Sequence, residues 1–330
     1  MYGAQTKFGI ARQATANSWV VAATSYHGVG FLSEDYGLTK QEVISQNLIG
    51  RFDQGATYGG IANVNGTLSF EITPRNIGAA LAGIFGPADV TVTSGSVQTY
   101  TFLPDTVDFS NTLCKFPFSV YKQFSDASSA ELFYDAQFSE LSVQLTQGQF
   151  TKGSLVLAGA SRVPTGIGSM NVLPVAADVG RLFPWNVCSI SWGGSALSQV
   201  SDITVKLNDN IAPVYTINGT LSPFKYTRSG FREVTVDGTF YMNDRALLND
   251  FVNETQRQLL ITIVNTKAAI QSGYYDTLFI DVPQLKLTDV KPGASGPGEV
   301  SVKFAGRGIL DPTSSYTIQF ILTNTYAGGY

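Results

Sequence analysis

The chain has 330 residues, of which 44% are apolar and 14% are charged, against about 25% charged residues in an average soluble domain. The formal net charge is −4 and no run of Lys or Arg occurs, which argues against a basic surface that binds phosphate groups. A single histidine excludes a zinc site built from several histidines.

The small charged fraction favours self-assembly. A monomer of this size needs more charge to cover its surface, whereas Lys, Glu and Asp are depleted in the cores of protein interfaces. Gly, Ser, Thr, Asn and Gln are plentiful instead. Much of the surface is therefore expected to lie against other copies of the chain. The alternative is a neutral, Ser- and Thr-rich surface of the kind found on many secreted β-proteins.

The N-terminal residues 1–26 predict an arm rich in Ala, Thr and Ser, with Trp19, Val20 and Val21 as its apolar anchor. They lack the continuous apolar run of a signal peptide, and no run of roughly 18 apolar residues could span a membrane. We expect a protein that folds in a cytoplasm, is not exported by the general secretory route and does not insert into a membrane.

Short strands are predicted next, at residues 27–32 and 41–46. Residues 33–60, which include the second of these strands, form a loop-rich stretch. It is longer than the loops that a compact domain normally contains without a function for them.

The stretch from Val64 to Pro87 predicts a strand that runs into a helix. Apolar and polar residues alternate up to Ile72, which is the period of a half-buried strand. Thr73 can cap the helix, and Pro74 fits its first position, where a missing N–H costs nothing. A Gly-Pro pair ends the helix. Its apolar face is formed by Ile77, Leu81, Ile84 and Phe85.

Downstream of the helix, the first half predicts further strands at 90–102, 116–124 and 131–133 and a β-hairpin at 138–160. Residues 160–184 contain several Pro and Gly residues and join the halves. A second loop-rich stretch covers 208–232. Strands of the second half are predicted at 186–192, 200–207, 259–264, 274–280 and 316–322.

The strand-to-helix block occurs again at residues 236–254. Val236 matches Val64 and Gly238 matches Gly66, at a constant offset of 172 (236 − 64). The hairpin also returns, at 285–306, with a Pro/Gly/Ser turn. A second helix is predicted to carry Leu247, Leu248, Phe251 and Val252. Strand, helix and hairpin in the same order, about half a chain apart, indicate an internal duplication.

The duplication predicts a mainly β fold of two tandem antiparallel β-sandwich or barrel domains, each with one flanking α-helix. The predicted first domain comprises residues 1–170, with the N-terminal arm, and the second comprises residues 171–330.

At these residues the chain resembles the tail tube (major tail) proteins of long-tailed bacteriophages, particularly the subfamily with a doubled tube domain. The resemblance covers most of the chain. It rests on the segments NGTLSFEITPRNIGAALAGIFG, ELSVQLTQGQFTKGSLVLAGA, DGTF, ITIVN and SVKFAG.

The resemblance implies a structural virion protein without a cofactor. Six tube domains of that family form a ring whose inner sheets join into a continuous barrel, and stacked rings conduct DNA during ejection. Two domains per chain imply a homotrimer with pseudo-sixfold symmetry, with a hexamer of single-domain chains as the alternative. The implied partners are other copies of the chain, within and between rings, and the tail terminator, tape measure and tail-tip proteins. The implied location is the virion tail, assembled in the host cytoplasm, and the two loop-rich stretches are implied to contact stacked rings.

A channel that conducts DNA without binding it requires sparse or balanced positive charge on its wall. The polar side chains that alternate along the first hairpin, such as Ser142 and Gln144, suit such a wall and suit an ordinary solvated sheet equally. Lys286 and Lys303 on the second hairpin fit less well. They are expected to pair with Asp289 or Glu299, or to face a neighbouring domain.

No catalytic, cofactor-binding or metal-binding residue is predicted. A Ser-His-Asp triad would have to use His27, and no G-x-S-x-G motif occurs, so His27 is expected to be a structural residue on a strand. The glycines of residues 293–298 lack the Lys-Ser/Thr of a phosphate loop and predict a hairpin tip. Cys114 and Cys188 are expected to be buried free thiols, with a disulfide as the alternative.

The main alternative function is a carbohydrate-binding or adhesive β-sandwich. Trp19, Trp185 and Trp192 would then be platforms on which sugar rings stack, whereas packing in the core or an interface is the simpler role for them.

Overall fold

The structure is a computed structural model that describes residues 6–18, 20, 26–47, 53, 55–124, 129–159, 161–163, 181–217, 219–242, 245–293 and 299–326. Several sequence-based expectations lie wholly or partly outside these residues. They include the Trp19–Val21 anchor, of which only Val20 is described, the tip at 293–298, of which only Gly293 is described, most of the stretch at 160–184 that joins the halves, and the domain boundary at 170/171.

The fold is mainly β, as predicted, and every strand pairing is antiparallel. The first half of the chain contains β1 (Lys7–Arg12), β2 (His27–Gly28), β3 (Ser33–Glu34), β4 (Gly37–Ile44), β5 (Thr57–Glu71), α1 (Pro74–Phe85), β6 (Asp89–Ser94), β7 (Val97–Phe102), β8 (Phe118–Gln123), β9 (Ala130–Thr146), β10 (Lys152–Ala158) and β11 (Ser161–Arg162).

The second half begins with a 3-10 turn, η4 (Trp185–Val187). It continues with β12 (Cys188–Trp192), β13 (Ser195–Ala196), β14 (Val200–Asn208), β15 (Ile211–Val214), β16 (Lys225–Arg228), β17 (Glu233–Tyr241), α2 (Ala246–Val252), β18 (Gln256–Gln271), β19 (Tyr274–Gly293), β20 (Ser301–Gly308) and β21 (Gln319–Asn324).

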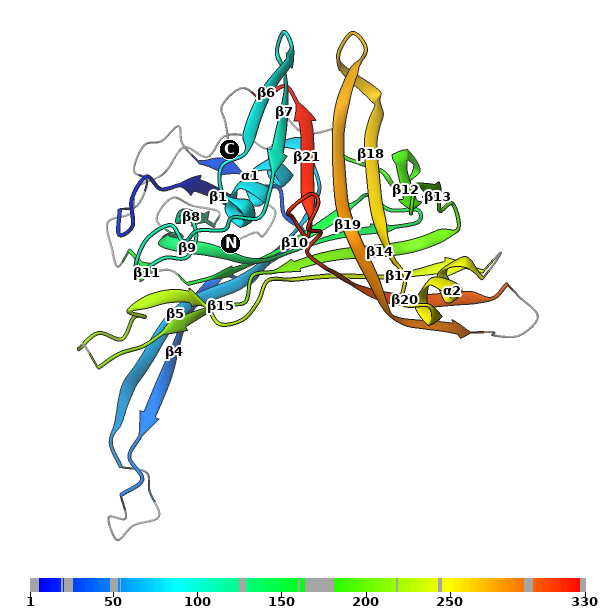
Figure 1. Ribbon diagram of the computed structural model, residues 1–330. Coiled ribbons are helices and arrows are strands. Elements are labelled where there is room, and N and C mark those ends of the chain that lie inside the picture. Colours follow the sequence, from blue (N-terminus) through cyan, green and yellow to red (C-terminus); the bar gives the residue numbers. More distant parts are fainter. Residues whose placement is uncertain are drawn as a thin grey trace.

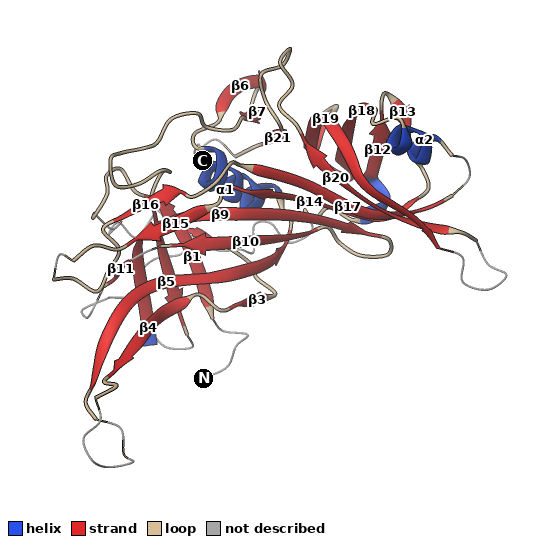
Figure 2. Cartoon of the chain, turned by 60° about the horizontal axis from the view of Figure 1, so that its bottom comes forward, coloured by secondary structure: helices blue, strands red, loops and turns tan. Residues whose placement is uncertain are grey.

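A long main sheet crosses both halves in the order β4–β5–β10–β9–β14–β17–β20–β19 (Figure 2). Along its strands, buried apolar and exposed polar side chains alternate. In β9, for example, Val143 is buried and Gln144 is exposed. The sheet therefore has one apolar and one polar face, and within the described residues it does not close into a barrel.

Two further groups of strands cover the apolar face. The first group consists of β1, β2, β8 and β11, which pair with one another or with β9. The second group consists of β12, β13, β18 and β21, which pair with one another or with β19. The hairpins β6–β7 and β18–β19 stand upright on either side of β21, and the β4–β5 hairpin projects in the opposite direction (Figure 1). One continuous cluster of buried apolar side chains links the two halves.

Seven strand pairings of the first half recur in the second half. The correspondence is as follows: β1–β2 matches β12–β13, β1–β8 matches β12–β18, β8–β9 matches β18–β19, β9–β10 matches β19–β20, β10–β5 matches β20–β17, β5–β4 matches β17–β14, and β9–β11 matches β19–β21. The β6–β7 hairpin has no such counterpart among the described strands.

The repeated glycine of each block lies where two strands approach closely. A Cβ added to Gly66 would lie 2.4 Å from the Cα of Tyr36, and one added to Gly238 would lie 2.6 Å from the carbonyl oxygen of Asp202. Both positions therefore require glycine for steric reasons.

The helix α1 begins as predicted, with a capping box in which Thr73 and Asn76 each bind the other's backbone N–H. It lies beside the main sheet but is buried along 11 of its 12 residues rather than on one face. The reason is β21, which packs over it: the rings of Phe85 and Phe320 lie 5.4 Å apart, and Asn324 donates a hydrogen bond to the Pro74 carbonyl.

Several predicted element boundaries are wrong. The N-terminal arm contains a core strand, β1, whose Phe8 and Ile10 are buried. The expected single strand at 90–102 is the β6–β7 hairpin. Strands expected separately at 131–133 and 138–146 are one strand, β9, and those at 274–280 and from 285 are one strand, β19. The first loop-rich stretch contains β3, β4 and the start of β5, and the second contains β15 and β16.

Candidate assembly surfaces

The polar face of the main sheet carries equal numbers of opposite charges. The strand registers place six carboxylates and six cations on it, from β5 to the end of β19. They are Glu71, Glu140, Asp202, Glu233, Asp237 and Asp289, and Lys152, Lys206, Lys286, Lys291, Lys303 and Arg307. This face is therefore highly polar and electrically balanced.

Ion pairs neutralise several of these cations. Lys206 lies 2.9 Å from Glu140, and Arg307 lies 3.0 Å from Glu233. Lys286 pairs with Glu254 and not with the expected Asp289 or Glu299, because Asp289 pairs with Lys291.

Lys303 lies directly opposite Lys291 on the neighbouring strand. Among the described residues, no carboxylate forms an ion pair with Lys303. Like charges in such cross-strand positions repel each other. The expectation of a carboxylate partner for Lys303 is therefore not met within the described chain.

The junction between the halves is a regular pairing of β9 with β14. Backbone hydrogen bonds run from Gln147 N–H to the Ser201 carbonyl at one end and from Asp209 N–H to the Ser139 carbonyl at the other, both at 2.9 Å. The Glu140–Lys206 ion pair spans the junction on its polar face. The two halves thus share one sheet.

Both outer edges of the main sheet are open in the part of the chain that the structure describes. β3 and β4 pair only with β5, and beyond Leu287 β19 pairs only with β20. Ala62, opposite Lys40, donates its N–H to the Leu221 carbonyl and not to β4. In an antiparallel ladder this leaves the N–H of Lys40 pointing outward. Unpaired backbone groups of this kind accept another strand.

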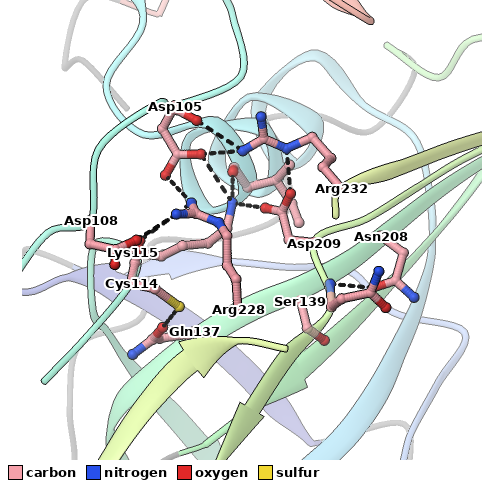
Figure 3. Close-up of polar contacts among 12 residues, drawn as sticks. Asp105, Asp108, Cys114, Lys115, Gln137, Ser139, Asn208, Asp209, Arg228 and Arg232 are labelled. Carbon is pink, nitrogen blue, oxygen red and sulfur yellow. Dashed lines mark hydrogen bonds and ion pairs between the residues drawn. The ribbon is translucent and has the colours of Figure 1, made fainter. Parts of the chain in front are cut away.

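A buried charged cluster ties the β15–β16 hairpin of the second half to the connection between β7 and β8 (Figure 3). Lys115 pairs with Asp209, and Arg232 bridges Asp209 and Asp105. Arg228 binds Asp105 at 2.8 Å and Asp108 at 2.5 Å. Lys115 also donates a hydrogen bond to the Ile84 carbonyl, in the last turn of α1, where a cation interacts favourably with the helix dipole.

Burial lowers the pKa of Lys115, while Asp209 and Asp105 raise it in opposition. The Lys115 and Asp209 side chains are only 2% and 0% exposed, so each depends on the other for compensation of its charge. The sequence analysis missed this cluster. Its members are scattered over more than 100 residues and show no spacing pattern.

Exposed apolar side chains gather on the projecting β4–β5 hairpin and on the neighbouring segment around β15 and β16. On the former, Tyr58 is 72% exposed and Val43 is 52% exposed. The other members are Leu38, Ile61, Ile217, Leu221, Phe224 and Phe231. Apolar groups concentrated in this way are typical of surfaces that bind another protein, a membrane or a ligand.

Two hollows flank Trp185, which is 44% exposed. One, of about 440 Å³, is lined by Phe150, Pro184 and Lys267 among others. The other, of about 490 Å³, lies beneath the end of the β9–β14 junction and is lined by Leu145, Ile190 and Leu197 among others. Both hollows are lined by a mixture of apolar and polar residues.

Of the sugar platforms that the alternative function would use, the structure describes Trp185 and Trp192. Trp192 is buried, and its Nε1 donates a hydrogen bond to Asp250 at 2.8 Å. Trp185 is the one described tryptophan with an accessible ring, because Trp19 lies outside the described residues. Packing, the simpler role, is what the structure shows for Trp192.

His27 lies on strand β2, as predicted, and its ring contacts the Tyr326 hydroxyl at 3.2 Å. Burial and the nearby Arg75 lower its pKa. Among the described residues, no group of three His, Cys, Asp or Glu side chains is arranged to hold a metal ion.

Cys114 and Cys188 are free thiols, as predicted; Cys114 is buried and Cys188 half-buried. Burial raises the pKa of each to about 11. We expect neither thiol to react with iodoacetamide at pH 8 in the folded protein, because only the thiolate is nucleophilic and on the order of one thiol in a thousand is ionised there. Mass spectrometry of protein alkylated with and without urea checks this. Labelling of either cysteine without urea, at the rate seen in urea, would contradict it.

A family model described as "Phage tail tube protein" matches residues 3–308. A search of curated proteins found no match. No helix within the described ranges is long and apolar enough to cross a membrane.

Proposed function

Because this chain belongs to the phage tail tube protein family, and is thus a structural protein of the virion tail, we propose that it closes its main sheet with further copies of itself into a ring. The rings stack into a tube that conducts DNA during ejection. The chain performs no chemistry in this role and carries no cofactor.

The observation that supports ring closure best is the β9–β14 junction inside the chain. There the end strand of one repeat pairs with the first main-sheet strand of the next repeat. The equivalent strands at the two edges of the main sheet, β19 and β3–β4, are open on their outer sides. A second copy can repeat the same pairing there.

The strand registers give the alignment of this pairing. Leu38 faces Val64 as Val205 faces Val236, so Leu38 is equivalent to Val205. Val205, covered by the first half, is 1% exposed, whereas Leu38 is 39% exposed. Closure in the same geometry buries Leu38 as the junction buries Val205. By the same argument Lys40 lies opposite Pro292 of the next copy.

Ring size follows from the number of repeats. We assign residues 1–170 and 171–330 to two equivalent tube domains, supported by the seven pairings that occur twice. If six domains complete a ring, three copies of the chain do so, and the ring has three times the mass of the chain. A ring of six chains is the alternative that the same measurement distinguishes.

The polar face of the main sheet is assigned to the channel wall. Its six carboxylates and six cations give DNA no net positive field to bind, so DNA passes without being held. The tail terminator, tape measure and tail-tip proteins are the remaining partners, and the host cytoplasm is the place of assembly.

Substitution Lys40→Pro tests ring closure. It removes the outward N–H at the centre of the proposed pairing and leaves the β4–β5 hydrogen bonds intact, because proline is tolerated on an edge strand where its missing N–H faces outward. We expect at least a tenfold loss of rings, measured by native mass spectrometry, with an unchanged circular dichroism spectrum.

The matched control is Lys40→Ala, which removes the same side chain but keeps the N–H and should form rings normally. Rings of normal mass and abundance from Lys40→Pro would rule out pairing through this edge.

A further inference from the structure

The charges on the polar face of the main sheet (Figure 2) lie in an ordered pattern. The strand registers sort the six carboxylates and six cations into four rows that cross the strands and alternate in sign. We propose that this alternation, rather than the equal totals, prevents the face from binding DNA, an inference that rests on the proposed assignment of the face to the channel wall.

Each row follows directly from residues that face each other on successive strands. On β17, for example, Glu233, Thr235, Asp237 and Thr239 belong to the first, second, third and fourth rows. The first and third rows are net negative, and the second and fourth are net positive. In this order, the charged members of the rows are Glu140 and Glu233; Lys206, Arg307 and Lys286; Glu71, Lys152, Asp237 and Asp289; and Asp202, Lys303 and Lys291.

Ion pairs on this face connect neighbouring rows. The two carboxylates of the first row each pair with a cation of the second row, at 2.9 and 3.0 Å. Asp289 of the third row pairs with Lys291 of the fourth. Opposite charges therefore meet between rows, along the direction of the strands.

Like charges meet across the strands β19 and β20. Lys286 lies directly opposite Arg307, and Lys291 lies directly opposite Lys303. Like charges in these positions destabilise a sheet, whereas opposite charges would stabilise it. Stability therefore does not explain the placement, and departures from a local rule of this kind are expected at functional sites. The rows explain both pairs, because each row keeps one sign across β20 and β19.

The spacing of the rows confines their electric field to the surface. Rows of the same sign are four residues apart along the strands, which is about 14 Å at roughly 3.4 Å per residue. A potential that alternates with this period decays over the period divided by 2π, which is about 2 Å for the spacing of these strands. A patch of one sign acts instead over the Debye length, about 8 Å in physiological salt. A phosphate group held off by a layer of water therefore meets little attraction.

Equal totals alone would not have this effect. If the same cations lay in adjoining rows, their fields would add and would attract phosphate groups over a Debye length. Asp237 and Asp289 prevent this, because they lie between the cations of the second row and those of the fourth.

Two double variants with the net charge of the wild type test the rows. Asp237→Lys with Lys152→Glu places a lysine between the second and fourth rows and joins their cations into one basic patch. The matched control, Glu71→Lys with Lys152→Glu, exchanges two charges that face each other. Its new lysine lies where the second row continues as Ser69 and Ser154, so no basic patch forms.

Binding of fluorescently labelled double-stranded DNA is measured by anisotropy on the full-length chain. The protein is kept unassembled by dilution, which native mass spectrometry verifies, so that the polar face is accessible. At an ionic strength of roughly 0.01 M, the Asp237→Lys double variant should bind at least tenfold more tightly than the control and the wild type. The difference should shrink at about 0.15 M salt, because the binding is electrostatic.

A second variant guards against a folding defect, which circular dichroism would reveal. Asp289→Lys with Lys152→Glu also places a lysine between the second and fourth rows, beside Lys291, and should give the same gain in affinity. It decides the outcome if the Asp237→Lys double variant does not fold.

The outcomes separate the two proposals. Wild-type protein that never forms rings overturns the proposed function, and the channel role of the rows with it. If wild-type rings form, two results overturn the role of the rows alone: DNA binding by the joined-row variants that is no tighter than binding by the control, or equally tight binding by the wild type.

Discussion

Replacement of Asp209 by alanine should lower the free energy of unfolding by about 3–5 kcal/mol, the usual cost of removing one partner from a buried ion pair. Asp209 is fully buried and compensates two cations, Lys115 and Arg232. Without it, Lys115 remains in the interior with only Asp105, at 3.9 Å, as a carboxylate partner. Chemical denaturation of wild-type and variant protein at pH 7 measures the difference.

The control for this experiment is Glu233→Ala. Glu233 also pairs with an arginine, Arg307, but the two side chains are 46% and 55% exposed. Exposed pairs contribute about 0–1 kcal/mol, so the control should change the stability by no more than that. Equal effects of the two substitutions would show that the cluster in Figure 3 is no more important than a surface ion pair.

Substitution Gly66→Ala should cost about 3 kcal/mol. The added methyl group would lie 2.4 Å from the Cα of Tyr36, and a backbone atom cannot rotate away as the end of a flexible side chain can. Strands β4 and β5 would have to separate locally, and overpacking of this kind costs typically about 1–3 kcal/mol or more. Thermal and chemical denaturation measure the loss.

Gly37→Ala provides a matched control on the facing strand, because an added Cβ there meets no atom within 4 Å. Its effect should stay within about 0.5 kcal/mol, as for surface substitutions in general. A stability of Gly66→Ala equal to that of Gly37→Ala would show that the two strands are not held as closely as the structure places them.

Local patterns predicted the elements whose structure is determined by neighbours in sequence. The strand before Thr73, the capped helix α1 and the hairpin of β9 and β10 all have a clear period and clear end signals, and the structure confirms them. The second helix is also present, although it covers only seven residues.

Features that depend on distant contacts could not be predicted in this way. β1 has no end signals and becomes a core strand because β8 pairs with it across more than 100 residues. Lys115 and Asp209 give no sign in the sequence that they meet. The open edges likewise depend on which strands are neighbours, and alternation along a single strand contains no such information.

The position of β21 has a consequence for biosynthesis. This strand, at residues 319–324, lies between β7 and β19 and pairs with both. Until β21 has been synthesised and has left the ribosome, the edges of β7 and β19 have no strand between them and can pair with other nascent chains. Pairing of β21 with β7 joins residues more than 200 positions apart in the sequence, and contacts of such high separation form slowly. We therefore expect chains truncated before Gln319 to aggregate during synthesis, so that mainly chains that contain β21 enter assembly.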